Sequence, residues 1–147
     1  MLGDEDAVST AFSKAAHVTT LTVRQNRVAV ASLEPRAAFA EWDGERLHFS
    51  FNSQGVWVAK RELARTLNLS EDAVHVMTPD VGGGFGMKSM NYPEHFAIAH
   101  AARAIGRPVA WVSDRSEAMQ SDNAARDLTS TAELAFDADN RLLAYRV

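Results

Sequence analysis

The sequence predicts an α+β fold in which a mixed β-sheet carries two main helices. Alternating apolar and polar residues dominate the first third of the chain, which indicates strands. Helix signals follow in two segments, an amphipathic stretch at 55–69 and an alanine-rich run at 93–105. A composition of 46% hydrophobic and 23% charged residues is typical of a compact globular protein with one folding unit.

The first third of the chain is expected to be β-structure. Residues 17–33 predict two strands joined by a polar turn at Arg24–Arg27. In residues 37–51, the pair Asp43 and Gly44 is a preferred two-residue hairpin turn. Apolar residues alternate with polar ones after this turn, namely Leu47, Phe49 and Phe51.

Two helices are predicted on either side of a glycine-rich loop. The apolar residues of segment 55–69 share one helical face, namely Val56, Ala59, Leu63 and Leu67. Residues 73–78 then predict a short strand that leads into the loop. Pro93 suits the first position of the second helix, and Gly106 ends it.

The last part of the chain is predicted to return to β-structure. The wholly apolar run 109–112 is typical of a strand that is buried on both faces of a sheet. Asp114 and Glu117 form a capping-box-like start for one or two helical turns. Residues 128–136 and 142–147 predict a final hairpin joined by a polar turn.

Charge and cysteine content narrow the possible functions. A net charge of -4 without a basic run gives no electrostatic basis for binding nucleic acid or an anionic membrane surface. The absence of cysteine excludes disulfides, thiolate metal sites and cysteine nucleophiles from this chain. No segment approaches the roughly 18 apolar residues of a membrane helix, and we expect a cytoplasmic protein.

The loop at residues 80–89 (DVGGGFGMKS) has a glycine density that favours close approach of the backbone to a ligand. Met87 breaks both the phosphate-binding P-loop and the dinucleotide fingerprint, because each motif requires glycine at that position. A nucleotide site built on Lys88 and Ser89 is therefore disfavoured. A mobile surface loop stays open as the alternative, because glycine collects in such loops.

Other candidate chemistry is limited. His95 and His100 are five residues apart and do not share a helical face, so structural or surface roles are expected for them. No serine lies in the G-x-S-x-G setting of a serine hydrolase. Gln54 lies between a predicted strand and a helix start, where its amide either contacts a cofactor or begins the helix.

The sequence resembles the large subunit of the molybdenum hydroxylases in four stretches that occur in family order. They are LEPRAAFAEWDG, FNSQGVWVAKRELARTLNL, PDVGGGFGMKSMNYPE and AARAIGRPVAWVSDRSEAM. The family includes xanthine oxidase, aldehyde oxidase and aerobic carbon monoxide dehydrogenase, and Leu33–Arg36 is most similar to the carbon monoxide dehydrogenase-like branch. The resemblance implies a single segment of the molybdopterin-binding domain at residues 11–147, preceded by an N-terminal extension at 1–10.

The resemblance also implies a cofactor site. In that family a Gly-Phe-Gly loop brings backbone amides beside the molybdenum centre and its pterin, a role that falls to Gly84, Phe85 and Gly86 here. Gln54 matches the glutamine that hydrogen-bonds near the apical oxygen of the metal. The implied cofactor of the complete enzyme is molybdopterin in its cytosine dinucleotide form, and the isolated chain need not retain it.

The implied activity is hydroxylation or oxidation of a small substrate with water-derived oxygen. Ser89 stands where xanthine-oxidising members carry a glutamate, so purine recognition through that carboxylate is not supported. The family's catalytic glutamate lies near the end of the large subunit, so no catalytic or metal-ligating residue is assigned and the chain alone is expected to be inactive. Implied partners are the remainder of the molybdenum subunit and the iron–sulfur and flavin domains or subunits. The alternative is a stand-alone structural or interaction domain that does not bind cofactor.

Overall fold

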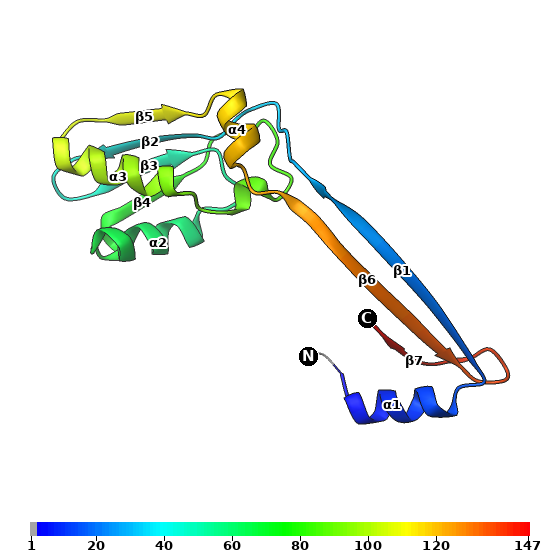
Figure 1. Ribbon diagram of the computed structural model, residues 1–147. Coiled ribbons are helices and arrows are strands. Elements are labelled where there is room, and N and C mark those ends of the chain that lie inside the picture. The colour runs from blue at the N-terminus through cyan, green and yellow to red at the C-terminus, as the bar shows by residue number, and fades with distance from the viewer. Residues whose placement is uncertain (1–2) are drawn as a thin grey trace. The chain divides into compact units, whose positions relative to one another are not determined.

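Residues 3–147 form two compact units in the computed structural model (Figure 1). The central unit spans Ala29–Ala125, and the terminal unit combines the segment up to Val28 with Arg126–Val147. The division into an extension at 1–10 and one domain at 11–147 stays a prediction, and residues 1 and 2 lie outside the described residues.

The central unit is built on a four-stranded mixed sheet with the strand order β4-β3-β2-β5. The strands are β2 (Ala37–Trp42), β3 (Leu47–Phe51), β4 (Val74–Met77) and β5 (Val109–Val112). Strand β2 pairs antiparallel with β3 and β5, whereas β3 pairs parallel with β4. The parallel pair needs a crossover connection, which helix α2 (Trp57–Leu67) supplies. The predicted mixed sheet is confirmed.

The β2–β3 hairpin has its turn one residue later than predicted. The Asp43 N–H donates to the Arg46 carbonyl at 3.2 Å, so Gly44 and Glu45 are the two central residues. Gly44 has a φ of +105°, which glycine adopts without strain. The Asp43 carboxylate accepts from the N–H groups of Glu45 and Arg46, which explains why aspartate precedes the turn.

Helices α2 and α3 (Pro93–Ile105) cover one face of the sheet (Figure 1). Both are predicted by the sequence, and both end in a left-handed residue, Asn68 for α2 and Gly106 for α3. Their apolar faces pack on alternate residues of β2 and β3, because residues two apart share a face of a strand. The central members of this core are Ala38, Ala40, Leu47, Phe49, Phe51, Ala59, Leu63, Leu67, Ile98, Ala99 and Ala102.

Shorter elements complete the central unit. They are the 3₁₀ turns η1 (Glu71–Ala73) and η2 (Met87–Ser89), and helix α4 (Arg115–Ser121). Helix α4 begins as predicted, with the Asp114 carboxylate accepting from the Glu117 N–H at 2.7 Å. Strand β5 differs from expectation because it pairs with β2 alone at the edge of the sheet. The Val112 side chain is 67% exposed, so the apolar run is not buried on both faces.

The terminal unit contains helix α1 (Glu5–Lys14) and a three-stranded sheet with the order β1-β6-β7. Strand β1 runs without a break from His17 to Val28, so the predicted turn at Arg24–Arg27 is wrong. Every residue of β1 is exposed, and polar side chains therefore continue the strand without a burial penalty.

Two local carboxylates shape the rest of this unit. Asp4 caps α1 by accepting from the Ala7 N–H at 3.0 Å, so the acidic N-terminal stretch begins a helix that the sequence analysis does not predict. Strands β6 (Ala125–Phe136) and β7 (Leu142–Arg146) form the predicted final hairpin, and the Asp137 carboxylate accepts from backbone N–H groups of its turn.

No helix within residues 3–147 is both long enough and apolar enough to span a membrane.

His95 is buried in the core of the central unit. Its ring lies edge-on to Phe51 with the centroids 5.0 Å apart, and its Nδ1 accepts from the Tyr92 N–H at 3.3 Å. Burial is the main cause that lowers the pKa of His95 from 6.5 to about 4, and the positive charge of Arg36 adds to it against the opposing effect of Glu94. The packing gives His95 the structural role that the sequence analysis expects.

Acidification is expected to destabilise the central unit through His95. The unfolded chain binds a proton at this residue below about pH 6.5, whereas the folded chain does so only near pH 4. Neutral His95 therefore adds its full share to the free energy of unfolding above pH 6.5, and this share is lost as the pH falls toward 4. The total loss is about 3 kcal/mol. Chemical denaturation of the native chain and a His95→Asn variant, near neutral pH and near pH 4, measures the difference. Equal losses of stability in the two chains contradict this role.

Candidate functional site

The glycine-rich loop follows β4 and leads through η2 into α3. Three of its residues have left-handed backbone, with φ of +97° at Gly83, +50° at Phe85 and +88° at Gly86. The Phe85 side chain is 77% exposed, so burial of this ring does not hold the loop in place. Polar contacts with neighbouring segments hold it instead.

Two of the glycines are required by close packing. A Cβ on Gly82 would lie 2.6 Å from the Glu34 Cβ, and a Cβ on Gly84 would lie 2.5 Å from Gln54 Oε1. Any side chain at either position would therefore displace its neighbour. At Gly86 a Cβ meets nothing within 4 Å, and only the φ of +88° favours glycine there. The loop thus packs on protein at Gly82 and Gly84 and has open space beside Gly86.

Gln54 holds the end of the loop that is nearer to α3. Its Oε1 accepts from the Gly86 N–H at 2.8 Å, and its backbone N–H donates to the Lys88 carbonyl at 3.1 Å. The side-chain amide NH₂ of Gln54 donates to no residue within 3–147. Helix α2 has Val56 at its N-cap and no side-chain cap, so the alternative in which Gln54 begins that helix is wrong.

Glu34 holds the end of the loop that is nearer to β4. Its Oε2 accepts from the Gly82 N–H at 2.8 Å and from Lys88 Nζ at 2.7 Å. Burial raises the pKa of Glu34, but the contacts with Lys88 and Gly82 outweigh it and leave the pKa below its usual value. The Lys88 side chain is 0% exposed, so its paired ammonium does not reach a phosphate in solution. This excludes the nucleotide site considered at Lys88 and Ser89.

Two buried polar residues directly after β3 bind segments that support the loop. Asn52 Oδ1 accepts from the Ala37 N–H at 2.9 Å, and Asn52 Nδ2 donates to the Pro35 carbonyl at 2.7 Å. Ser53 Oγ lies 3.1 Å from the Lys88 carbonyl oxygen. The segments that contact the loop are therefore fixed to one another as well as to the loop.

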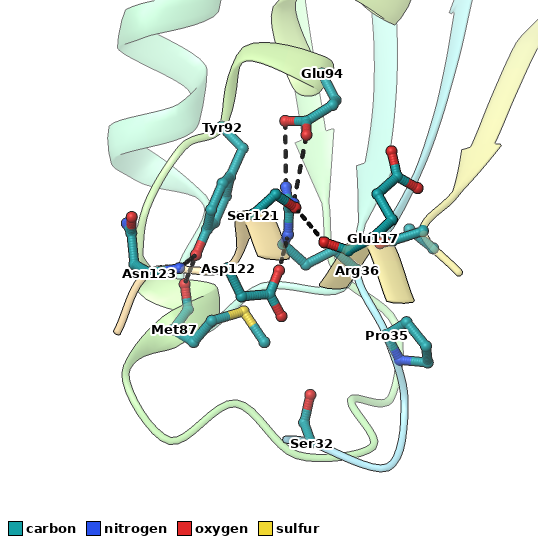
Figure 2. A network of polar contacts seen from close by, with 12 residues as sticks. Ser32, Pro35, Arg36, Met87, Tyr92, Glu94, Glu117, Ser121, Asp122 and Asn123 are labelled. Atoms are coloured by element: carbon teal, nitrogen blue, oxygen red, sulfur yellow. Dashed lines mark hydrogen bonds and ion pairs between the residues drawn. The ribbon is translucent and has the colours of Figure 1, made fainter. Parts of the chain in front are cut away.

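Arg36 is the centre of a buried network beside this site (Figure 2). Its side chain is 1% exposed, and its Nε donates to Asp122 Oδ1 at 2.6 Å. Nη1 donates to Glu94 Oε2 at 3.2 Å, and Nη2 donates to Ser121 Oγ at 2.9 Å. The guanidinium also stacks on Tyr92, 3.7 Å from the ring centroid. Burial lowers the pKa of Arg36, but the hydrogen bonds to Glu94 and Asp122 outweigh it and raise the pKa, so the group stays charged.

Tyr92 connects this network to the glycine-rich loop (Figure 2). Its hydroxyl donates to the Met87 carbonyl at 3.0 Å and accepts from the Asn123 N–H at 3.2 Å. Burial raises the pKa of Tyr92, which keeps the hydroxyl protonated as a donor. The turn after the loop, the start of α3 and the segment after α4 meet at this one side chain.

The structure brings together three of the four site residues predicted from sequence, Gln54, Gly84 and Gly86, while the ring of Phe85 is exposed. Three further residues support the site although no sequence pattern predicts this role for them, namely Glu34, Arg36 and Lys88. Their partners lie 54, 58 and 86 residues away along the chain, and no local pattern reveals such pairs. The one local signal is the pair of charges within Leu33–Arg36, a stretch that carries part of the family resemblance.

These features leave main-chain donors of the loop without an acceptor among residues 3–147. The N–H groups of Gly84 and Phe85 donate to no residue within the described part of the chain. Amides held in a fixed loop stabilise an oxo group or an anionic oxygen without a titratable side chain. Such a loop on a helix-covered sheet suits a large cofactor with many acceptor atoms.

The sequence matches the family described as Molybdopterin cofactor-binding domain over residues 2–147, and the chain belongs to this family. The resemblance to the molybdenum hydroxylases is thereby confirmed.

Similar proteins lie within the same enzyme family. The chain is 36% identical over 137 residues to the 6-hydroxypseudooxynicotine dehydrogenase complex subunit gamma of Paenarthrobacter nicotinovorans, covering 92% of this chain and 17% of that protein. It is 32% identical over 147 residues to the carbon monoxide dehydrogenase large chain of Afipia carboxidovorans, covering 99% and 18%. The solved CO dehydrogenase from Oligotropha carboxidovorans matches with a TM-score of 0.86 at 33% identity, covering 98% of this chain and 18% of that one. The chain thus spans less than a fifth of the length of these relatives.

Loss of the Arg36 guanidinium is expected to destabilise the central unit strongly. In an Arg36→Met variant the Asp122 carboxylate, only 6% exposed, is left without its partner, and the expected cost is about 3–5 kcal/mol. Arg36→Lys should restore little, because a point charge cannot replace the directed hydrogen bonds to Asp122, Glu94 and Ser121. Urea denaturation measures the loss.

Arg146→Met in the terminal unit is the matched control, since Arg146 is also paired, with Glu133, but its side chain is 51% exposed. This variant should keep a nearly native melting temperature. An Arg36→Met variant that is as stable as the control contradicts the importance of the buried network.

Proposed function

We propose that this chain is a cofactor-contacting segment of a molybdenum hydroxylase, an oxidoreductase that hydroxylates or oxidises a small substrate with water-derived oxygen. Gln54, Gly84, Phe85 and Gly86 face molybdopterin in this proposal. Family membership supports the cofactor, and the loop geometry supports the residues.

The observation that carries the proposal is the set of unused donors on a fixed loop. Gly84 and Phe85 offer backbone N–H groups, and Gln54 offers its side-chain NH₂, with no acceptor for them among residues 3–147. Molybdopterin presents carbonyl, phosphate and metal-bound oxygens, which are acceptors that such donors fit. The open space beside Gly86 lets the backbone come close to a bulky ligand.

The cofactor supplies the redox chemistry when bound, and the residues of this chain supply binding and orientation. Gln54 is aimed by its own hydrogen bond, because Oε1 is engaged by the Gly86 N–H and the NH₂ group is left for the ligand. No catalytic residue is proposed within the chain, and the isolated chain is expected to be inactive.

The complete enzyme is proposed to contain the remainder of the molybdenum subunit together with iron–sulfur and flavin domains or subunits. We favour the cytosine dinucleotide form of the cofactor. The similar proteins include a carbon monoxide dehydrogenase and a nicotine 6-hydroxylase, so the family match does not select a substrate. A cytoplasmic location stays a prediction from the sequence.

Gly86→Val is expected to reduce cofactor loading of the assembled enzyme at least about tenfold, because its side chain enters the space beside the loop. Gly44→Val is a close control: Gly44 also has positive φ, +105° against +88°, and a Cβ there also meets nothing within 4 Å. Backbone strain should therefore lower the melting temperatures of both variants similarly. Molybdenum and pterin contents, measured beside each melt, report the loading.

Equal loading of the two variants would show that Gly86 does not face the cofactor. An assembled native enzyme that contains neither molybdenum nor pterin would favour the alternative, a structural or interaction domain of this family without a cofactor.

A further inference from the structure

Lys88 contacts both residues that hold the glycine-rich loop. Its ammonium donates to Glu34, which accepts from the Gly82 N–H with the same carboxylate oxygen. Its backbone carbonyl accepts from the N–H of Gln54, which in turn accepts from the Gly86 N–H. One residue therefore belongs to two chains of hydrogen bonds that reach the two ends of the loop.

We propose that Lys88 is the positioning residue of the glycine-rich loop. Through Glu34 it fixes the amide of Gly82, and through Gln54 it fixes the amide of Gly86. The N–H groups of Gly84 and Phe85 lie between these two fixed points. That these two N–H groups hold the cofactor rests on the proposed function. That Lys88 positions them does not.

The charge of Lys88 requires an explanation beyond filling space. A fully buried ammonium is costly unless it is paired, and an apolar side chain of similar length fills the same volume without that cost. The Glu34 carboxylate does not require an ion pair with Lys88 to stay charged, because its side chain is 38% exposed and water can solvate it. The effect of the ammonium is to hold Glu34 in one rotamer, against the entropy that a half-exposed side chain otherwise keeps.

The local backbone lets Lys88 act on the whole loop. The Met87 N–H donates to the Gly84 carbonyl at 3.0 Å, and the Ser89 N–H donates to the Gly86 carbonyl at 3.1 Å. These successive tight turns link residues 84–89 by backbone hydrogen bonds into one segment that includes Lys88. Anchoring Lys88 therefore anchors the amides of Gly84 and Phe85 with it.

Amide hydrogen exchange of the 147-residue chain, followed by NMR, tests the proposal without any cofactor. In a Lys88→Met variant the Gly82 amide should exchange at least about tenfold faster, because Glu34 is no longer held. The Gly86 amide should change less, since the substitution leaves in place the backbone carbonyl that binds Gln54. The melting temperature should stay near the native value, because no buried charge is left unpaired.

Lys14→Met is the matched control, since it removes the same charge from an exposed position on α1. It should leave the exchange of both amides unchanged. If Lys88→Met does not fold, Lys88→Leu provides the same measurement, because it also removes the ammonium and leaves no buried charge unpaired. Native exchange at Gly82 in a folded Lys88→Met or Lys88→Leu variant overturns the proposal.

Molybdopterin binding, followed by pterin fluorescence in the assembled enzyme, provides the second measurement. Lys88→Met should weaken it about tenfold, a change that a purely structural role with a native melt does not produce. If Gly82 exchange rises in the variant while even the native enzyme binds no pterin, the proposed function fails and the positioning role of Lys88 stands.

Discussion

The buried guanidinium of Arg36 constrains the packing of the rest of the central unit. A charge that is removed from water must meet its partners at hydrogen-bond distance, and Arg36 meets Asp122, Glu94 and the ring of Tyr92. These residues belong to the first turn of α3 and to the segment after α4, so neither element can shift without unpairing the charge. Tyr92 extends this constraint to the glycine-rich loop through the Met87 carbonyl.

The segment Leu33–Arg36 contacts two parts of the central unit, because its two charged residues have different partners. Glu34 contacts the Gly82 amide and Lys88, whereas Arg36 contacts Glu94 in the first turn of α3 and Asp122 directly after α4. Asn52 then binds the backbone on both sides of Arg36, at Pro35 and Ala37. The start of β2, the end of β3 and the loop therefore form one rigid support, and the candidate donors belong to this support.

Much of the fold follows from local sequence patterns, and the site follows only in part. Apolar spacing in segment 55–69 and the stop at Gly106 predict α2 and α3, because helix packing and capping are local effects. Strand β1 is not predicted correctly by such patterns. Its polar residues at Arg24–Arg27 indicate a turn, but an exposed strand can contain polar residues throughout. The partners of Lys88 and Arg36 depend on the completed topology, and nothing near either residue specifies them.

The left-handed backbone at Gly83, Phe85 and Gly86 bears on the entropy of ligand binding at this loop. Fixing the backbone of one residue costs about 1–2 kcal/mol in conformational entropy, and a free loop of this length pays several times that on binding. Here the ordering takes place during folding, since Glu34, Gln54 and Lys88 already hold the loop. A ligand that binds at this loop as proposed would then order little backbone, and its binding would carry a correspondingly small entropic loss.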